Sequence, residues 1–122
     1  MTTYPRKEGA FMLAAIGGVS LKRWYYAPEF FWRASQALRQ ARGDPLCLHA
    51  GMFPHRGLYF SLSVWHDAEA MLTFAQSGPH RQVVQAAARL ADVNTFYHFP
   101  CIAVPSRDQA LQVWAQQGQA AE

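Results

Sequence analysis

One segment near the middle of the chain, from Leu58 to His80, restricts the fold more than any other. Its first eight residues alternate, and successive side chains of a strand point to opposite faces. One face would carry Leu58, Phe60, Leu62 and Val64, and the other Tyr59, Ser61, Ser63 and Trp65. The second set is amphiphilic, which is typical of a surface that contacts a ligand or another subunit.

The same segment continues with a helix, a break and the start of a second helix. Asp67 is suited to cap the first helix, which carries an apolar face of Met71, Leu72, Phe74 and Ala75. We expect Gly78 to end this helix and Pro79 to open the next one. His80 would then lie in the first turn of the second helix.

The N-terminal half predicts a strand, a helix and a hairpin. Residues 11–20 form a continuous apolar run, which indicates a strand covered on both faces. Pro28 suits the first turn of a helix over 29–42, whose apolar residues form one stripe. A second strand over 46–52 leads through residues 53–57 to the strand that begins at Leu58. This loop is expected to be longer than a tight two-residue turn.

The C-terminal part predicts a last strand and a last helix. The strand-like run over 94–104 contains Pro100, which favours an edge strand or a bulge. Residues 106–109 (Ser-Arg-Asp-Gln) form a capping box ahead of a helix that should pack on the domain through Trp114 and end at Gly118.

This order of elements predicts an α+β fold, the ferredoxin-like β-α-β-β-α-β arrangement with an added C-terminal helix. Residues 1–122 would form a single domain, with a core at about 10–104 and the last helix at about 106–118. An antiparallel sheet in the order 4-1-3-2 places strands two and four at opposite edges. Cys47 and Cys101 would then lie too far apart for a disulfide.

Composition and spacing argue against several classes of partner. The formal charge is +3, but the basic residues are scattered rather than gathered in a patch, so no nucleic acid is expected. No apolar run approaches the ~20 residues that span a bilayer, so we expect no membrane association and a cytoplasmic location with reduced thiols. The histidines and cysteines lack the close spacing of a metal site, and neither a metal nor a resident cofactor is predicted.

His80 and Trp65 are the candidate functional residues. At the positive end of a helix dipole the imidazole is expected to stay neutral near pH 7, when it can accept a proton or donate a hydrogen bond. The alternatives are a histidine that only hydrogen-bonds at a helix end and a tryptophan that only packs in the core. Their placement at one strand end and one helix start favours a shared pocket.

The segment from Ser63 to His80 resembles the dimeric α/β-barrel proteins of the antibiotic-biosynthesis-monooxygenase type. Within that group it is most similar to the spheroidene-monooxygenase-like and related uncharacterised branch. The resemblance implies a homodimer in which two sheets meet to form a barrel, with a pocket between sheet and helices in each protomer. It also implies a monooxygenase-like protein, either cofactor-independent or haem-associated, that acts on an electron-rich apolar or aromatic molecule.

The residues and the resemblance together lead to one functional hypothesis and two alternatives. We expect an apolar or aromatic small molecule to bind beside Trp65, Tyr59 and Phe74, with His80 as the catalytic base or hydrogen-bond partner. One alternative is a non-catalytic binder of haem or another hydrophobic ligand, with His80 as axial ligand. The other is a structural dimer whose Tyr59 face is only an interface.

Overall fold

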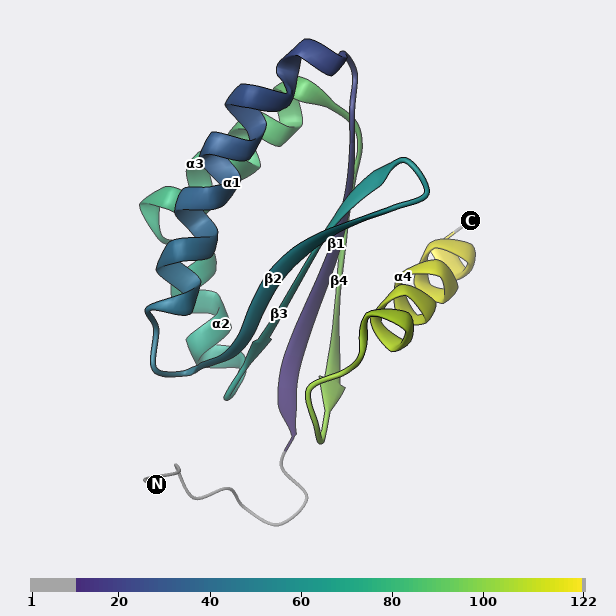
Figure 1. Cartoon of the computed structure of the whole chain (residues 1–122). Coiled ribbons are helices and arrows are strands. Elements are labelled where there is room, and N and C mark those ends of the chain that lie inside the picture. The colour runs from purple at the N-terminus through teal and green to yellow at the C-terminus, as the bar shows by residue number, and fades with distance from the viewer. Residues whose placement is uncertain (1–10, 122) are drawn as a thin grey trace.

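The computed structural model describes residues 11–121 and contains one four-stranded sheet with helices on both of its faces (Figure 1). The elements are β1 (Met12–Leu21), the short 3-10 helix η1 (Trp24–Tyr26), α1 (Ala27–Arg42), β2 (Cys47–His55), β3 (Leu58–Trp65), α2 (Ala68–Ala75), α3 (Gly78–Leu90), β4 (Ala91–Cys101) and α4 (Arg107–Ala121). The predicted α+β arrangement is confirmed, with its second helical part divided into α2 and α3.

The sheet is antiparallel and runs in the order β2-β3-β1-β4, as predicted. Its central strand β1 pairs Ile16 with Leu62 of β3 and with Tyr97 of β4. The outer strands β2 and β4 carry Cys47 and Cys101, so the two cysteines lie on opposite edge strands of the sheet. The expected separation of the two thiols is therefore confirmed.

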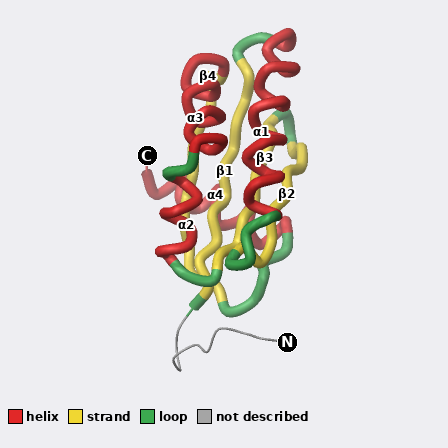
Figure 2. Tube along the Cα trace, turned by 90° about the vertical axis from the view of Figure 1, so that its left-hand side faces the viewer, coloured by secondary structure: helices red, strands yellow, loops and turns green. Residues whose placement is uncertain are grey.

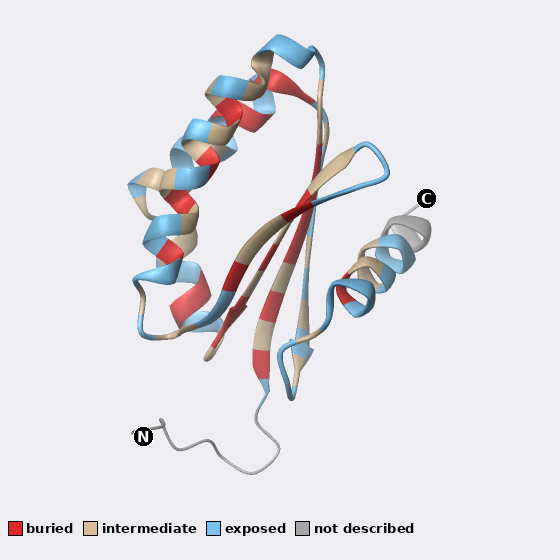
Figure 3. Cartoon of the chain, in the orientation of Figure 1, coloured by how far each residue is buried: buried red, intermediate tan, exposed pale blue. Residues whose placement is uncertain are grey.

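The two faces of the sheet are covered differently. Helices α1, α2 and α3 lie on one face, and α4 lies alone on the other (Figure 1). Seen from the helical side, α1 and α3 run side by side, with α3 near β4 and α1 near β2 (Figure 2). The side chains of Ala14, Ile16 and Val64 on the α4 face are fully buried, and buried residues recur along the central strand β1 (Figure 3). The face through which two sheets were expected to meet is thus occupied by the chain's own helix.

The attachment of α4 follows the sequence pattern at its start but not at its end. The Ser106 hydroxyl accepts from the Gln109 amide at 3.1 Å, and the Gln109 side chain accepts from the Ser106 amide at 2.9 Å, which confirms the capping box. Trp114 packs edge-to-face on Phe60 and donates its indole N–H to the Thr95 carbonyl at 3.2 Å. The predicted end at Gly118 is wrong, because α4 continues to Ala121.

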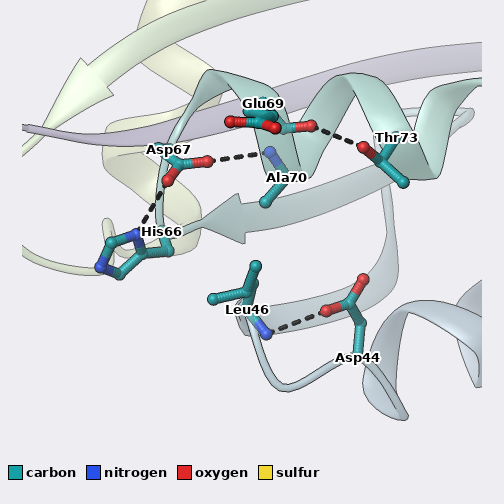
Figure 4. Close-up of polar contacts among 7 residues, drawn as sticks. All are labelled: Asp44, Leu46, His66, Asp67, Glu69, Ala70 and Thr73. Atoms are coloured by element: carbon teal, nitrogen blue, oxygen red, sulfur yellow. Dashed lines mark hydrogen bonds and ion pairs between the residues drawn. The ribbon is translucent and has the colours of Figure 1, made fainter. Parts of the chain in front are cut away.

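The connection from β3 to α2 is fixed by the predicted N-cap. The Asp67 carboxylate accepts from the Ala70 amide at 2.8 Å and contacts His66 Nδ1 at 3.1 Å (Figure 4). The predicted role of Gly78 is wrong, since α2 ends at Ala75 and Gly78 is the first residue of α3. The extended backbone of Ser77 makes the break, so no glycine is needed to end the helix.

Two strand boundaries differ from the prediction. The hairpin has a tight turn at Arg56 and Gly57, both with positive φ (50° and 83°), because β2 continues through Pro54 to His55. Proline is tolerated there since β2 is an edge strand. In β4, Pro100 pairs in register with Leu13, which confirms the edge-strand interpretation. That strand starts at Ala91 and ends at Cys101, earlier than expected at both ends.

Candidate functional site

A cavity of about 370 Å³ lies between the sheet and helices α1, α2 and α3. All four residues singled out in the sequence, Tyr59, Trp65, Phe74 and His80, line it. They come from β3, α2 and α3, so the fold brings together side chains that the chain separates. The Tyr59 face of β3 thus lies beneath the helices and borders a cavity, which argues against the alternative in which this face is only a subunit interface.

Small side chains on the floor create the space. Adjacent rows across the sheet place Ser63 beside Ala15 and Ser61 beside Gly17. On β2, Ala50 pairs with Ser63 and extends the first of these rows. Short side chains at alternating strand positions therefore leave the space that the cavity occupies.

Gly17 also makes room for an aromatic ring from β4. A Cβ atom at this position would lie 2.3 Å from two ring carbons of Phe96 and 3.2 Å from the Ser61 hydroxyl oxygen. Gly17 pairs with Phe96 in the sheet, so the ring of Phe96 lies across the strand where a side chain is missing. The two-glycine stretch in β1 thus serves close packing.

Three aromatic rings form one end of the cavity. Trp65 and Phe74 stack with ring centroids 4.8 Å apart and an interplanar angle of 30°. Phe74 then meets His80 edge-to-face at 4.9 Å. Phe74 therefore connects the predicted tryptophan with the predicted histidine.

Trp65 is fully buried, yet its indole Nε1 has no hydrogen-bond partner among the described residues. A buried N–H group usually finds an acceptor, because leaving it unpaired costs ~1–3 kcal/mol. An acceptor on a bound molecule would remove this cost.

The geometry of His80 fixes which of its nitrogens carries hydrogen. Nδ1 lies 3.1 Å from the carbonyl oxygen of Ala75, and a carbonyl only accepts, so Nδ1 is the donor. Neutral His80 consequently has an unprotonated Nε2. Burial lowers the pKa of His80 below its ordinary value, against a smaller opposing effect of the Ala75 hydrogen bond. The imidazole is thus neutral near pH 7 and offers one acceptor nitrogen.

Tyr59 lies at the other end of β3 from Trp65. Its ring packs edge-to-face on Phe31 of α1 at 4.7 Å, which joins the sheet to the helical layer. Its side chain borders the cavity and is half-buried. Tyr59 therefore contributes an aromatic wall rather than a member of the Trp65–His80 cluster.

Sequence reasoning missed the contribution of β1 and β4. Ala15 lines the floor, and Asn94, Phe96 and His98 of β4 line the side. Alternation in β4 could have revealed these three residues, because they occupy every second position of an edge strand. In β1 no alternation of polar and apolar residues indicated which side chains face the cavity, because the whole strand is apolar.

The lining is uncharged, since none of the described residues that border the cavity is Asp, Glu, Lys or Arg. Across residues 11–121, no group of three or more His, Cys, Asp and Glu side chains gathers to hold a metal ion. In the same part of the chain, no helix combines the length and hydropathy needed to cross a bilayer. The site is thus suited to a neutral apolar molecule with few polar groups.

Comparisons with known proteins support the fold. No protein-family model and no curated protein matches the chain. Among solved structures, a protein from Nitrosomonas europaea, provisionally described as an antibiotic biosynthesis monooxygenase, superposes with a TM-score of 0.68 at 7% identity. The match covers 85% of this chain and 100% of that one.

Two further structures agree. A Caulobacter crescentus protein with the same provisional description gives a TM-score of 0.65 at 14% identity, over 79% of this chain and 92% of that one. A Bacteroides thetaiotaomicron protein described as of unknown function and a "possible oxidoreductase" gives a TM-score of 0.65 at 15% identity. The match covers 74% of this chain and 97% of that one. The chain therefore has the ferredoxin-like α+β fold of the antibiotic biosynthesis monooxygenase-like proteins.

Proposed function

We propose that this chain is a monooxygenase-like protein that binds a flat apolar or aromatic molecule between its sheet and helices α1 to α3. The observation that carries the proposal is the cavity of about 370 Å³ with aromatic walls and a floor of small side chains. Protein interiors are normally close-packed, so a cavity of this size in a short chain is consistent with a ligand site. Its uncharged lining favours a neutral ring system.

His80 is the proposed base. Its Nε2 is unprotonated when the ring is neutral, because Nδ1 donates to the Ala75 carbonyl. The lowered pKa keeps this form dominant at neutral pH. Nε2 can therefore accept a hydrogen bond from a ligand hydroxyl, or a proton from a carbon acidified by neighbouring aromatic rings.

The proposed reaction uses dioxygen as co-reactant. An activated CH₂ group loses a proton to His80, and the resulting carbanion is oxidised by O₂. One oxygen atom ends in a new carbonyl group and the other leaves as water with the two hydrogens, so no external reductant is required. Aromatic walls that exclude water would protect the carbanion from being reprotonated. The monooxygenase descriptions of similar structures support this reaction class.

Haem fits this pocket less well than a neutral ligand does. Nε2 of His80 could serve as an axial ligand, but no Arg or Lys among the described lining residues is available for the two propionates. A Soret band after haem titration that disappears in His80→Ala would favour the haem-binding alternative.

The homodimer remains part of the proposal. Because α4 covers the sheet face that buries Ile16 and Val64, a second copy would have to pack around this helix or exchange it. Sedimentation velocity on the full chain at micromolar concentration measures the oligomeric state directly, and a monomer would contradict the dimer.

Anthrone, which carries a CH₂ between two aromatic rings, tests the enzymatic proposal. Oxygen uptake with anthrone should require the protein and fall at least about tenfold in His80→Asn, which keeps a donor to Ala75 but lacks a basic nitrogen. Saturable binding of anthrone without oxygen uptake would instead identify a non-catalytic binder. Failure to bind either anthrone or 2-naphthol would contradict the proposed site altogether.

A further inference from the structure

The cavity opens on the side of β4. Lining residues from α1, β2 and β3 are buried or half-buried, whereas all three from β4 are exposed. Across from β4, Leu72 of α2 and Val84 of α3 also line the cavity and are 53% and 39% exposed. The mouth therefore lies between the edge strand β4 and the helices α2 and α3. Figure 2 shows α2 and α3 on the same side of the molecule as β4.

Phe96 stands at the centre of this mouth. Phe96 is 43% exposed, although its ring packs over Gly17 at the floor. Asn94 and His98 lie two residues to either side, so all three share one face of β4. The mouth thus has an apolar centre with one polar side chain at each end.

The sheet register shows that His98, and not Asn94, lies at the Trp65 end. His98 pairs with Ala15, which pairs with Ser63, two residues before Trp65. Asn94 is ~13 Å further along the strand, in the row that contains Tyr59. Because Phe74 connects Trp65 with His80, both histidines belong to the same end of the cavity.

We propose that His98 is a second polar anchor of this site, whose ring N–H donates to a hydrogen-bond acceptor of the ligand at the mouth. This inference rests on the proposed function and adds to it a requirement on the ligand. His80 presents an acceptor nitrogen from the helical layer, whereas exposed His98 can orient an N–H toward the cavity. The preferred ligands are aromatic molecules with a carbonyl or carboxylate group that stays at the mouth.

Two naphthalene probes separate the two anchors. 2-Naphthol carries only a hydroxyl group, and 2-naphthoate carries only a carboxylate. Both are fluorescent and can be titrated against the full chain. His98→Ala should weaken 2-naphthoate binding roughly tenfold, the usual effect of losing a hydrogen bond to a charged group, and leave 2-naphthol within about twofold. Tyr97→Phe, one residue away on the α4 face of the same strand, serves as the matched control and should change neither affinity.

Two other results of these titrations would overturn the assignment of His98. Unchanged 2-naphthoate affinity in His98→Ala would overturn the assignment of His98, and so would a loss in Asn94→Ala alone, which would mean that the carboxylate lies at the opposite end. The proposed function is judged separately by 2-naphthol, whose affinity should fall in His80→Ala. If 2-naphthol depends on His80 but 2-naphthoate does not depend on His98, only the further inference fails.

Discussion

Nδ1 of His80 lies 3.1 Å from the carbonyl oxygen of Ala75, so the first turn of α3 is tied to the last residue of α2. This contact satisfies a carbonyl at the end of a helix and at the same time sets the tautomer of the histidine. The break between the two helices is thus part of the site, because it turns Nε2 of His80 into the available acceptor.

The lowered pKa of His80 predicts a loss of stability in acid. In the folded protein the pKa lies below its ordinary value of 6.5, so the unfolded chain binds this proton first as the pH falls. Folding stability contributed by neutral His80 should be complete above about pH 6.5 and decline as the pH drops toward the folded-state pKa. Urea unfolding at pH 5 to 8 should show a steeper decline in the wild type than in His80→Asn; equal slopes would mean that His80 titrates normally.

Filling the floor of the cavity should weaken ligand binding strongly without a large cost in stability. Ala15→Leu places a larger side chain in the empty space between Ser63 and His98, and we expect 2-naphthol affinity to fall more than about tenfold. Ala14→Leu is the matched control, because Ala14 is fully buried on the opposite, close-packed face. It should cost ~1–3 kcal/mol of unfolding free energy and leave the cavity in place. Comparable destabilisation by both variants would indicate that the cavity is packed in solution.

Gly17 and Phe96 should be energetically coupled. Gly17→Ala would place a methyl group against the Phe96 ring and should destabilise the protein by ~1–3 kcal/mol. In a Phe96→Ala background the same change should cost much less, because only the 3.2 Å contact with the Ser61 hydroxyl oxygen remains and alanine is preferred over glycine in a strand. A double-mutant cycle by urea denaturation measures the coupling, and additive effects would place the ring elsewhere.

The attachment of α4 can be tested through Trp114. Trp114→Ala removes the contact with Phe60 and the hydrogen bond to the Thr95 carbonyl, and should lower the free energy of unfolding by about 3 kcal/mol. Gln112→Ala, exposed on the same helix, should change it by less than ~0.5 kcal/mol. Equal stability of the two variants would mean that α4 leaves the sheet in solution.

The fold was predictable where local chemistry and periodicity agree. Asp67, Pro28 and the Ser106–Gln109 box each perform the role that their position in the sequence indicates. The predicted boundaries are wrong at residue types that occur both in loops and in regular elements. Pro54 looks like part of a loop but lies in an edge strand, and Gly78 looks like a helix end but starts one.

The site was predictable in its aromatic wall and not in its floor or mouth. Trp65 and His80 can be recognised in the sequence because Trp65 ends a strand and His80 lies in the first turn of a helix. Ala15 and Gly17 matter through the volume that they leave empty, which only the pairing of β1 with its neighbours defines. His98 lines the cavity because β4 pairs with β1. This long-range pairing cannot be predicted from the spacing of the histidines along the chain.

The most direct test of the central claim is the ¹⁵N NMR spectrum of the His80 side chain, recorded with and without 2-naphthol. We predict the Nδ1-protonated tautomer in the free protein at pH 7, and a shift of Nε2 on saturation with 2-naphthol as it accepts a hydrogen bond. The same titration of Ala15→Leu should leave Nε2 unchanged. An Nε2-protonated ring, or an Nε2 signal that does not respond to saturating 2-naphthol, would contradict the assignment of His80 as the acceptor of this pocket.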